Sequence, residues 1–421
     1  MGDNSASAAF RGKTTFTTDC GMSPDPIPLE PYRSHAFFEK TRDNVFGRSW
    51  LLMGRVEEIP EHGDYVVRRI QPNNVSALLL RDKSGEVRAY YNSCSHRGSE
   101  VTAADQGNRK RIVCPYHNWT YGTDGALVGI PDEESFFGID KSKCGLTPMS
   151  CAVWEGWMFI NLQKTPEVSL SDFLGDFGQH LAGVNYVAAQ NPVVITADLD
   201  ANWKVVVDAF IESYHIPAIH PRTIAATFSS DENRFARLLD AKVFGPHRTV
   251  SMYGNPALAL DPDNKVEFLA YSNSGTGSLI SGGTSDAMRE FLAHPTVNPT
   301  RSSSWSMDVN HLFPNTQIDF GPGGFWIHQF WPLSANTSRY EVKFYVPEAL
   351  NVRQRLQQEL YVSRVVEVVL EDLDNVARTQ RGIDSGGKDH IHLQDSEVGI
   401  RHSTLQVIKW AEAETVAEAM A

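Results

Sequence analysis

Two short groups of cysteine and histidine residues have the types and spacing of metal ligands. The first is Cys94-Ser-His96-Arg-Gly98, and the second is Cys114-Pro-Tyr-His117-Asn-Trp119, with seventeen residues between His96 and Cys114. The apolar runs on either side end in Gly and Pro, which predicts that each group lies in a short loop. Two thiolates and two imidazoles suit either a structural zinc ion or an iron–sulfur cluster.

The order of the four ligands separates these two interpretations. A zinc finger usually pairs like ligands, as C-x2–4-C and H-x3–5-H. Here each loop carries one Cys and one His, namely Cys94 with His96 and Cys114 with His117. A Rieske [2Fe–2S] cluster needs this arrangement, because two thiolates hold one iron and two imidazoles hold the other. The pattern therefore favours a Rieske cluster over zinc.

His215 and His220 form a second pair of candidate ligands. Helical apolar spacing before them predicts a helix with Asn202 or Asp200 as its N-cap, which ends or kinks at Pro217. On a straight helix two side chains five residues apart point about 140° away from each other, and a kink at Pro217 removes that objection. Two His are often ordinary polar residues, but two His and one carboxylate make the facial triad of non-haem Fe(II) oxygenases.

The third ligand of such a triad must be an acid. A long helix is predicted from about 352 to 382, and Asp372 lies at the edge of its apolar stripe. Asp374 lies farther round this helix, and Glu371 faces nearly opposite to the stripe. An acid that borders a buried face needs a partner, which a metal or a neighbouring arginine of the same helix would supply. Periodicity alone leaves both alternatives open for Asp372.

Glu212 precedes His215 by three residues and would face it on the predicted helix. A carboxylate in this position often hydrogen-bonds an imidazole ligand and orients it. The alternative is a solvated surface glutamate.

The elements that must position these residues change along the chain. Residues 1–44 are expected to form a tail and a helix, 45–165 an all-β module and 166–421 a second domain, with a boundary near Lys164-Thr-Pro166. Residues 225–300 have weak periodicity, which favours a lid or a substrate-lining loop. The remaining predictions are an antiparallel meander over 310–347 and a last helix that ends near Trp410. The predicted fold class is α+β.

Composition excludes some function classes. The formal net charge of −13 argues against nucleic acid as a partner. No apolar run approaches the length of a membrane span, so we expect no membrane association. Three cysteines, Cys20, Cys144 and Cys151, remain outside the candidate cluster and suggest no disulfide framework, so a cytoplasmic location is expected.

With these motifs in view, the sequence resembles the large (α) subunits of Rieske non-haem iron ring-hydroxylating oxygenases. The resemblance spans most of the chain, and its motifs occur in the family's order. They are Cys94 to Trp119, Asn202-Trp-Lys204, Glu212-Ser-Tyr-His215 with His220-Pro221, and Glu371-Asp372 with Gln380-Arg-Gly382. The resemblance assigns Cys94, His96, Cys114 and His117 to the [2Fe–2S] cluster, and His215, His220 and Asp372 to a mononuclear Fe(II).

The resemblance also implies an architecture and partners. It predicts an N-terminal Rieske domain, a C-terminal helix-grip catalytic domain with an antiparallel sheet, and a homotrimer. In such a trimer Glu212 would bridge a cluster ligand of one subunit, His117, to His215 of the next. Electrons would come from NAD(P)H through a separate flavin reductase, which agrees with the absence of a G-x-G-x-x-G motif after a strand. A ferredoxin and a small β subunit are left open.

The implied function is a terminal oxygenase that uses dioxygen to hydroxylate or dihydroxylate an aromatic or other hydrophobic ring. Most aromatic-ring dioxygenases of the family have Asp where this chain has Glu212, and Glu also occurs in relatives that oxidise N-methyl or quaternary ammonium compounds. Demethylation or hydroxylation of such a compound, or of a methoxy compound, is therefore the alternative, with Asp208 or Asp231 as acids for a cation. An electron carrier or a zinc-stabilised binding module are alternatives of other classes.

Overall fold

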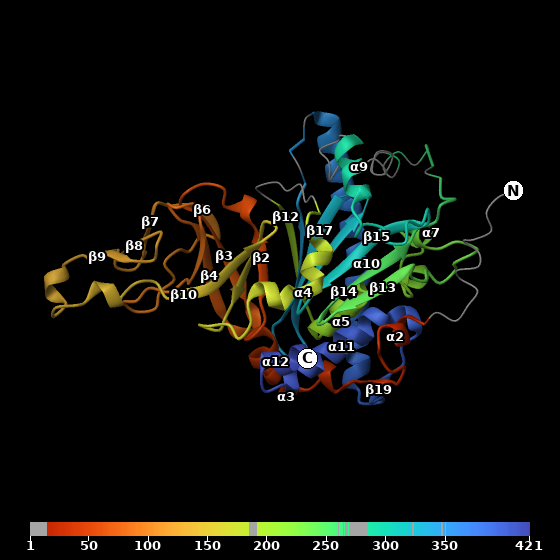
Figure 1. Cartoon of the computed structure of the whole chain (residues 1–421), viewed down its shortest axis with the longest axis horizontal. Coiled ribbons are helices and arrows are strands. Elements are labelled where there is room, and N and C mark those ends of the chain that lie inside the picture. Colours follow the sequence, from red (N-terminus) through yellow and green to blue (C-terminus); the bar gives the residue numbers. More distant parts are fainter. Residues whose placement is uncertain are drawn as a thin grey trace. The chain divides into compact units, whose positions relative to one another are not determined.

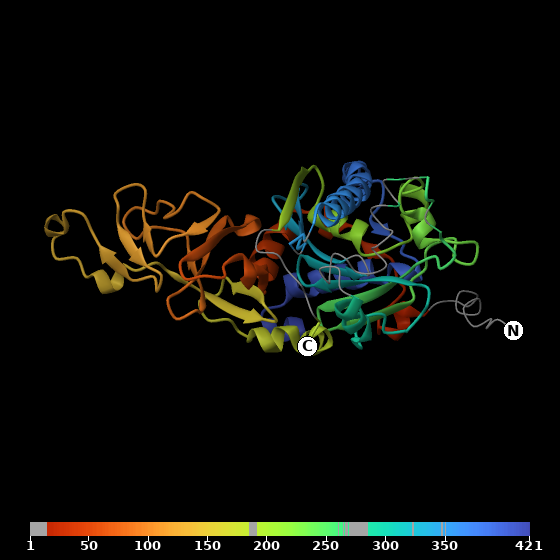
Figure 2. The same cartoon turned by 90° about the horizontal axis from the view of Figure 1, so that it is seen from above.

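The computed structural model describes residues 15–184, 192–259, 261–263, 265, 268, 285–321, 324–346, 348–349 and 351–421. The N-terminal tail predicted from the sequence lies outside the described residues. The chain divides into two compact units. Residues 42–173 and 415–417 form the first, called the β unit, and residues 1–41, 174–414 and 418–421 form the second, called the α+β unit (Figures 1 and 2).

The β unit contains a seven-stranded sheet and a smaller three-stranded sheet. The order of the first is β2-β11-β10-β5-β4-β3-β6, and that of the second is β7-β8-β9. Their bounds are Leu51–Arg55 (β2), Asp64–Ile70 (β3), Val75–Arg81 (β4), Val87–Tyr91 (β5), Gln106–Asn108 (β6), Arg111–Val113 (β7), Thr120–Gly122 (β8), Leu127–Gly129 (β9), Pro148–Trp154 (β10) and Trp157–Asn161 (β11). The region 45–165, predicted to be all-β, contains these ten strands.

The core of the β unit surrounds the two cysteines of the first motif. Cys94 and Cys114 belong to the same buried cluster as Trp119 and Tyr121. Alternation along the short strands β7 and β8 directs Ile112 and Tyr121 into this cluster, because successive side chains of a strand point to opposite faces. The candidate cluster ligands are therefore anchored to a hydrophobic core.

The α+β unit is built on an antiparallel seven-stranded sheet in the order β12-β18-β17-β16-β15-β14-β13. The bounds are Val193–Leu199 (β12), Asp240–Phe244 (β13), His247–Tyr253 (β14), Trp305–Leu312 (β15), Thr316–Gly321 (β16), Gly324–Pro332 (β17) and Ser338–Phe344 (β18). The meander expected over 310–347 is confirmed in β15 to β18, whose consecutive strands pair side by side. Residues 322 and 323 of one predicted turn lie outside the described residues.

Helices α5 and α11 pack on one face of this sheet, called the inner face, and α9 packs on the other face, where Phe291 contacts Phe320. Phe210 at the end of α5 contacts the rings of His328, Phe330 and Tyr340, and Val398 of α11 shares a core with Val250 and Val309. The long blue helix α10 runs beside the strands (Figures 1 and 2). The helix bounds are Phe16–Asp19 (α2), His35–Lys40 (α3), Leu170–Leu181 (α4), Trp203–Phe210 (α5), Ile216–Ile219 (α6), Ala225–Phe228 (α7), Ser285–Ala293 (α9), Val352–Asp384 (α10), Val398–Glu412 (α11) and Val416–Met420 (α12). A short strand pair joins β1 (Ile27–Pro28) to β19 (His390–Ile391).

The predicted helices around the second motif need one correction. Asn202 caps α5, as expected, because its side-chain oxygen accepts a hydrogen bond from the Lys204 amide. However, α5 ends at Phe210, and Pro217 lies in the first turn of a separate helix, α6. Proline is well suited to the first turn of a helix, where its missing N–H costs nothing. The two histidines thus lie at the two ends of the short helix α6, and no kink within one longer helix brings them together.

A second correction concerns residues 225–300, predicted to be a lid or loop. Within this stretch β13 and β14 form a hairpin at one edge of the sheet, and every residue of β14 is buried. A strand buried on both faces has no polar–apolar alternation, so periodicity could not reveal it. Residues 260, 264, 266, 267 and 269–284 of the predicted lid lie outside the described residues.

None of the described helices is both long enough and apolar enough to cross a bilayer.

Candidate metal centres

The two loops of the first motif have the same backbone design. The carbonyl of Cys94 accepts a hydrogen bond from the amide of Gly98, and the carbonyl of Cys114 accepts one from Asn118, at 2.9 and 3.0 Å. Gly98 and Asn118, each four residues after its cysteine, have φ of 76° and 57°. Gly and Asn adopt this left-handed conformation most readily. The sequence therefore closes two matching tight turns, each holding one Cys and one His.

The side chains of these loops segregate by type. The thiols of Cys94 and Cys114 are buried, whereas the imidazoles of His96 and His117 are only partly buried and their Nδ1 atoms lie 3.2 Å apart. The ring of His96 stacks on Trp119 at 5.0 Å between centroids. The thiols thus lie together inside and the imidazoles together near the surface.

This arrangement fits a two-iron cluster better than a single zinc ion. Zinc would require all four ligand atoms to converge on one point at roughly 2.0–2.3 Å. Among the described residues, His215, His220 and Asp372 form the one group of three or more ligands whose atoms all lie within 4.8 Å of each other. The Cys and His pairs do not converge in this way, as expected if each pair serves a different iron.

The environment of Cys94 favours the thiol form when no metal is bound. Burial is the largest cause that raises the pKa of Cys94, and the neighbouring Cys114 raises it further. The hydroxyl of Tyr121, 3.1 Å from Sγ, acts in the opposite direction. A hydroxyl at this position would also donate to a sulfur ligand, which is a recognised way of tuning a cluster's reduction potential.

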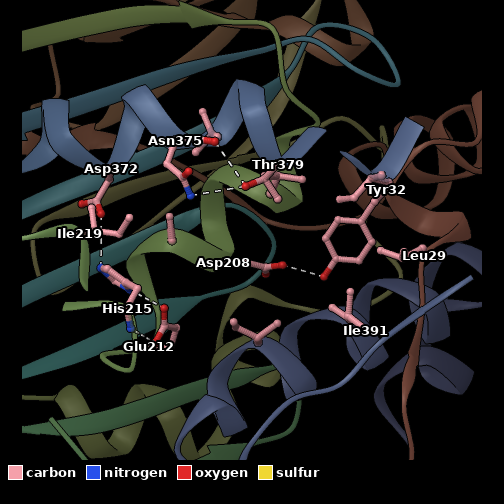
Figure 3. Close-up of a pocket in the computed structure, with 15 residues that line it drawn as sticks. Leu29, Tyr32, Asp208, Glu212, His215, Ile219, Asp372, Asn375, Thr379 and Ile391 are labelled. Carbon is pink, nitrogen blue, oxygen red and sulfur yellow. Dashed lines mark hydrogen bonds and ion pairs between the residues drawn. The ribbon is translucent and has the colours of Figure 1, made fainter. Parts of the chain in front are cut away.

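The second motif brings three side chains from distant elements to one point. His215 Nε2 lies 3.2 Å from His220 Nε2, and Asp372 Oδ1 lies 3.3 and 2.9 Å from these two nitrogens. His215 directly precedes α6, His220 follows it, and Asp372 belongs to α10. His220 and Asp372 are buried, and one fifth of the His215 side chain is exposed. These three residues are called the triad, of which Figure 3 shows His215 and Asp372.

In each triad histidine, a glutamate carboxylate contacts Nδ1, the ring nitrogen that faces away from Asp372. Glu212 Oε1 contacts Nδ1 of His215, and its other oxygen accepts hydrogen bonds from the amides of Tyr214 and His215. Glu371 Oε2 lies 2.7 Å from Nδ1 of His220. Both Nε2 atoms are thereby directed toward Asp372, which is the usual way in which ligand histidines are oriented at a metal.

Glu371 corrects an expectation from the sequence. The helical wheel places it nearly opposite to the apolar stripe of its helix, yet it contacts His220 and also accepts a hydrogen bond from the Thr223 hydroxyl. His220 and Thr223 come from a segment 148 or more residues earlier that packs against this side of α10. A helical wheel shows only the residues of its own helix. It therefore cannot reveal the contact of Glu371 with His220, which is distant in the sequence.

Electrostatics hold the triad together before any ion binds. Burial alone would lower the pKa of His215, but hydrogen bonds and charges of Asp372 and Glu212 raise it to about 10. Burial acts to raise the pKa of Asp372, and its two histidine partners overcome this effect and lower it. An ion would replace the proton shared by these groups, because metal ligands must be deprotonated.

A cavity adjoins the triad. Its walls come from α5, α10, α11 and the segment around Leu29 and Tyr32, and it reaches Glu212, His215 and Asp372 at one end (Figure 3). The predicted residue Asp208 lies between these residues and Tyr32 (Figure 3), and its Oδ2 accepts a hydrogen bond of 2.7 Å from the Tyr32 hydroxyl. Burial raises the pKa of Asp208 to about 7. Asp208 thus lines the same cavity as His215 and Asp372, but it is hydrogen-bonded to Tyr32 and not to a triad residue.

Comparison with known proteins places this chain among oxygenases. A Rieske [2Fe-2S] domain model matches residues 49–147, and a model of the ring hydroxylating alpha subunit catalytic domain matches residues 191–413. The cofactors of these two domains are a Rieske cluster and a mononuclear iron. The chain belongs to the family of ring-hydroxylating oxygenase alpha subunits. The predicted family and the α+β fold class, with the Rieske domain first, are confirmed.

Individual relatives differ in their named substrates. The chain is 32% identical to the glycine betaine monooxygenase oxygenase subunit of Pseudomonas aeruginosa over 206 residues, 49% of this chain and 47% of that protein. It is 33% identical to the biphenyl 2,3-dioxygenase alpha subunit of Rhodococcus jostii over 199 residues, 44% and 42% of the two chains. The matched segment spans about half the length of these curated relatives.

Solved structures share the fold. A quaternary ammonium Rieske monooxygenase superposes with a TM-score of 0.72 at 22% identity, over 95% of this chain and 99% of that one. Naphthalene 1,2-dioxygenase from Rhodococcus sp. gives the same TM-score and identity, over 98% and 99%.

Proposed function

We propose that this chain is the terminal component of an oxygenase that oxidises a small organic molecule with dioxygen. The observation that carries the proposal is the triad of His215, His220 and Asp372, whose ligand atoms converge beside a cavity. Electrons would come from NAD(P)H through a separate reductase, with or without a ferredoxin. A pure electron carrier has no use for the triad or for the large α+β unit.

The triad residues would hold the mononuclear iron. Bound there, Fe(II) supplies the activation of dioxygen, and three protein ligands leave coordination positions for dioxygen and substrate. Glu212 and Glu371 would keep both imidazoles in the orientation and tautomer that bind metal through Nε2. The buried walls around His220 and Asp372 would limit the access of water.

Cys94, Cys114, His96 and His117 would hold the [2Fe–2S] cluster. In the expected homotrimer, Glu212 would relay electrons from His117 of one subunit to His215 of the next. Support for this role comes from the contact between Glu212 and His215, and from a structurally similar quaternary ammonium Rieske monooxygenase that is described as transferring electrons between subunits. The carboxylate needs a second partner to complete the relay, and a partly exposed imidazole such as His117 is chemically suited to be one.

Two substrate classes are compatible with this machinery. Hydroxylation or dihydroxylation of an aromatic or other hydrophobic ring is the prediction from the family resemblance. Oxidation of a quaternary ammonium or N-methyl compound is the second candidate, favoured by Glu212 and by relatives named for glycine betaine and carnitine.

The test is product analysis under ¹⁸O-labelled dioxygen with a surrogate reductase and NADH. The panel contains aromatic acids, polycyclic rings, methoxyarenes and quaternary amines. We expect labelled product from one class, and formaldehyde if a methyl group is removed. The protein should contain about three iron atoms per chain, of which the Asp372→Ala variant loses one. No product with any compound, from protein that keeps only about two iron atoms after reconstitution, would refute the oxygenase and leave an electron carrier.

A further inference from the structure

Two sequence motifs that contribute no triad residue meet at Tyr32, namely Asn202-Trp-Lys204 and Gln380-Arg-Gly382. The side-chain oxygen of Gln380 accepts a hydrogen bond of 2.8 Å from the Asn202 amide, and its NH2 group donates one of 3.1 Å to the Tyr32 carbonyl. Lys204 Nζ lies 5.1 Å from the centroid of the Tyr32 ring. The two motifs therefore hold Tyr32 against both α5 and α10.

The hydroxyl of Tyr32 holds one oxygen of Asp208. It donates a hydrogen bond of 2.7 Å to Asp208 Oδ2, and the Thr404 hydroxyl lies 2.7 Å from the same phenol oxygen. Since the single phenol proton goes to Asp208, Thr404 is the donor to Tyr32. Among the described residues no donor reaches the other carboxyl oxygen, Oδ1, which is buried. A proton bound by Asp208 therefore belongs on Oδ1, and the bond from Tyr32 is kept in both protonation states.

Asp208 lines the cavity that also reaches the triad (Figure 3). This cavity has a volume of about 190 Å³, which is enough for several water molecules. Its walls are mostly aliphatic, and Asn375 and Thr379 follow Asp372 along α10 as polar groups of one wall. Away from the metal centre, the ionisable side chains among its described lining residues are Asp208 and Tyr32.

The surroundings of Asp208 favour a carboxyl group that exchanges its proton near neutral pH. Burial raises its pKa to about 7, whereas the hydrogen bond from Tyr32 and the charges of Lys204 and Arg248 act to lower it. Glu397, directly before α11, raises the pKa further. Burial also lowers the pKa of Lys204 to about 7 and raises that of the Tyr32 phenol, which stays neutral. Of the two groups that line the cavity, Asp208 is therefore the one that can both hold and release a proton.

Oxygenation with dioxygen consumes protons as well as electrons. If one oxygen atom enters the substrate, two electrons and two protons convert the other to water. If both atoms enter a ring, two electrons and two protons complete the two hydroxyl groups. The reductase would supply the electrons, and the protons must come from groups near the reacting oxygen. Asp372 cannot be their source while it holds the ion, because metal ligands must be deprotonated.

We propose that Asp208 delivers these protons through water in the cavity, and that Tyr32 is the residue that positions it. This inference rests on the proposed oxygenase function and adds the proton donor. The O–H bond at Oδ1 breaks, its proton passes along the water to the oxygen that is being reduced, and the carboxylate takes a new proton from solvent. Replacement protons can enter from outside, because Ile219 and Asn375 line both this cavity and a surface groove along α10.

The first measurement needs no turnover. Infrared difference spectra of the protein with both metal centres loaded are recorded across neutral pH. We expect a carbonyl band of a protonated carboxylic acid that disappears with a midpoint near pH 7 in the wild type and is missing from Asp208→Asn. Glu397 gives a similar band, since burial raises its pKa to about 7, but that band stays in both proteins. Identical spectra of the two proteins overturn the proposal.

The matched control is Asp308→Asn. Asp308 is also buried, and burial raises its pKa to about 6. However, it lies on the opposite face of the sheet from its neighbour Val309, which packs under α11, and it is hydrogen-bonded to Ser251 and Trp305. This variant should keep the band of Asp208 and the wild-type rate of product formation.

The second measurement is a single turnover of pre-reduced protein with dioxygen and the panel compound that yields the most product. Asp208→Asn keeps the shape and the bond from Tyr32 but has no acidic proton, so product formation should slow by about 100-fold or more. Its iron content should stay unchanged. In the wild type the rate should fall as pH rises through the pKa of Asp208, because the carboxylate has no proton to give. An undiminished rate in iron-loaded Asp208→Asn overturns the proposal.

Tyr32→Phe tests the positioning role. The hydrogen bond from Tyr32 stabilises the carboxylate, so its removal should raise the pKa of Asp208 and move the fall in rate upward by about one pH unit. A merely structural role would change the rate or the iron content without moving this midpoint. An unchanged midpoint overturns the role of Tyr32.

The outcomes separate this inference from the proposed function. No product from the wild type with any compound refutes the oxygenase and the proton donor with it, even if Asp208 titrates as expected. Equal product formation by the wild type and Asp208→Asn refutes only the proton donor.

Discussion

The four ligands of the cluster site come from two loops with the same backbone turn, whereas the three ligands of the triad come from segments up to 157 residues apart in the sequence. In the loops, each cysteine carbonyl binds an amide four residues later, and Gly98 and Asn118 provide the backbone conformation that the turn needs. In the triad, a loop, a short helix and a long helix must meet, and 152 residues separate His220 from Asp372. The cluster site is therefore determined by two short stretches of sequence, whereas the triad depends on how the α+β unit packs.

The two sites also differ in how their histidines are supported. His96 rests on the ring of Trp119, and the partly exposed pair of imidazoles is held by packing. His215 and His220 are each held by a carboxylate. A carboxylate raises the basicity of an imidazole ligand and fixes its tautomer, which suits an exchangeable single ion. This difference leads to the following predictions.

The largest effect is expected at the cluster. Cys114→Ser should remove nearly all visible absorbance of the cluster and lower the stability of the β unit, since the thiol belongs to its core. Helical content from the α+β unit should persist, because the units have separate cores. Absorbance and circular dichroism measure these changes. Retention of the full cluster spectrum would show that Cys114 is not a ligand.

Removing the carboxylate of the triad should give the reciprocal result. Asp372→Ala should lose the mononuclear iron and with it nearly all product formation, because dioxygen activation would depend on the bound metal. The cluster spectrum should stay unchanged. Iron analysis and the reduced-cluster spectrum test this prediction, and loss of the cluster in this variant would contradict the independence of the two sites.

A smaller effect is expected when the support of His220 is weakened. Glu371→Gln should lower the affinity of the metal-depleted protein for Fe(II) by about 10- to 100-fold. The matched control is Glu367→Gln, one turn earlier on α10, where the side chain is 60% exposed and paired with Arg364. Titration with Fe(II) without dioxygen measures the affinity. Equal affinities of the two variants would mean that Glu371 does not position His220.

The smallest effect concerns the hydroxyl beside Cys94. Tyr121→Phe removes a hydrogen bond worth about 1 kcal/mol, so the reduction potential of the cluster should fall by roughly 40 mV for a one-electron couple. Spectroelectrochemical titration measures the shift. The control is Tyr90→Phe in the same core, whose hydroxyl binds the Thr123 carbonyl instead of a ligand. An unchanged potential in Tyr121→Phe would exclude this role.

Several elements could be predicted because their signals are local. The strands of the β unit, the cap at Asn202 and the meander from β15 to β18 follow from alternation, turn residues and capping chemistry within a few residues. The end of α5 at Phe210 could not be predicted, because the helical apolar spacing of the sequence continues beyond this residue. Strand β14 could not be predicted either, because it is buried on both faces and therefore shows no polar–apolar alternation.

The sequence alone was sufficient to identify the cluster motif and the helix that carries Asp372. Both are recognised from residue spacing within a short segment, the Cys and His spacing for the cluster and the apolar periodicity for the helix. The sequence could not choose Asp372 over a salt-bridged rim carboxylate without the family resemblance, and it misplaced Glu371. Only the tertiary structure brought Asp372 to His215 and His220 and set Glu371 against His220. The physical reason is that spacing fixes the direction of a side chain relative to its own element, whereas packing decides what that side chain meets.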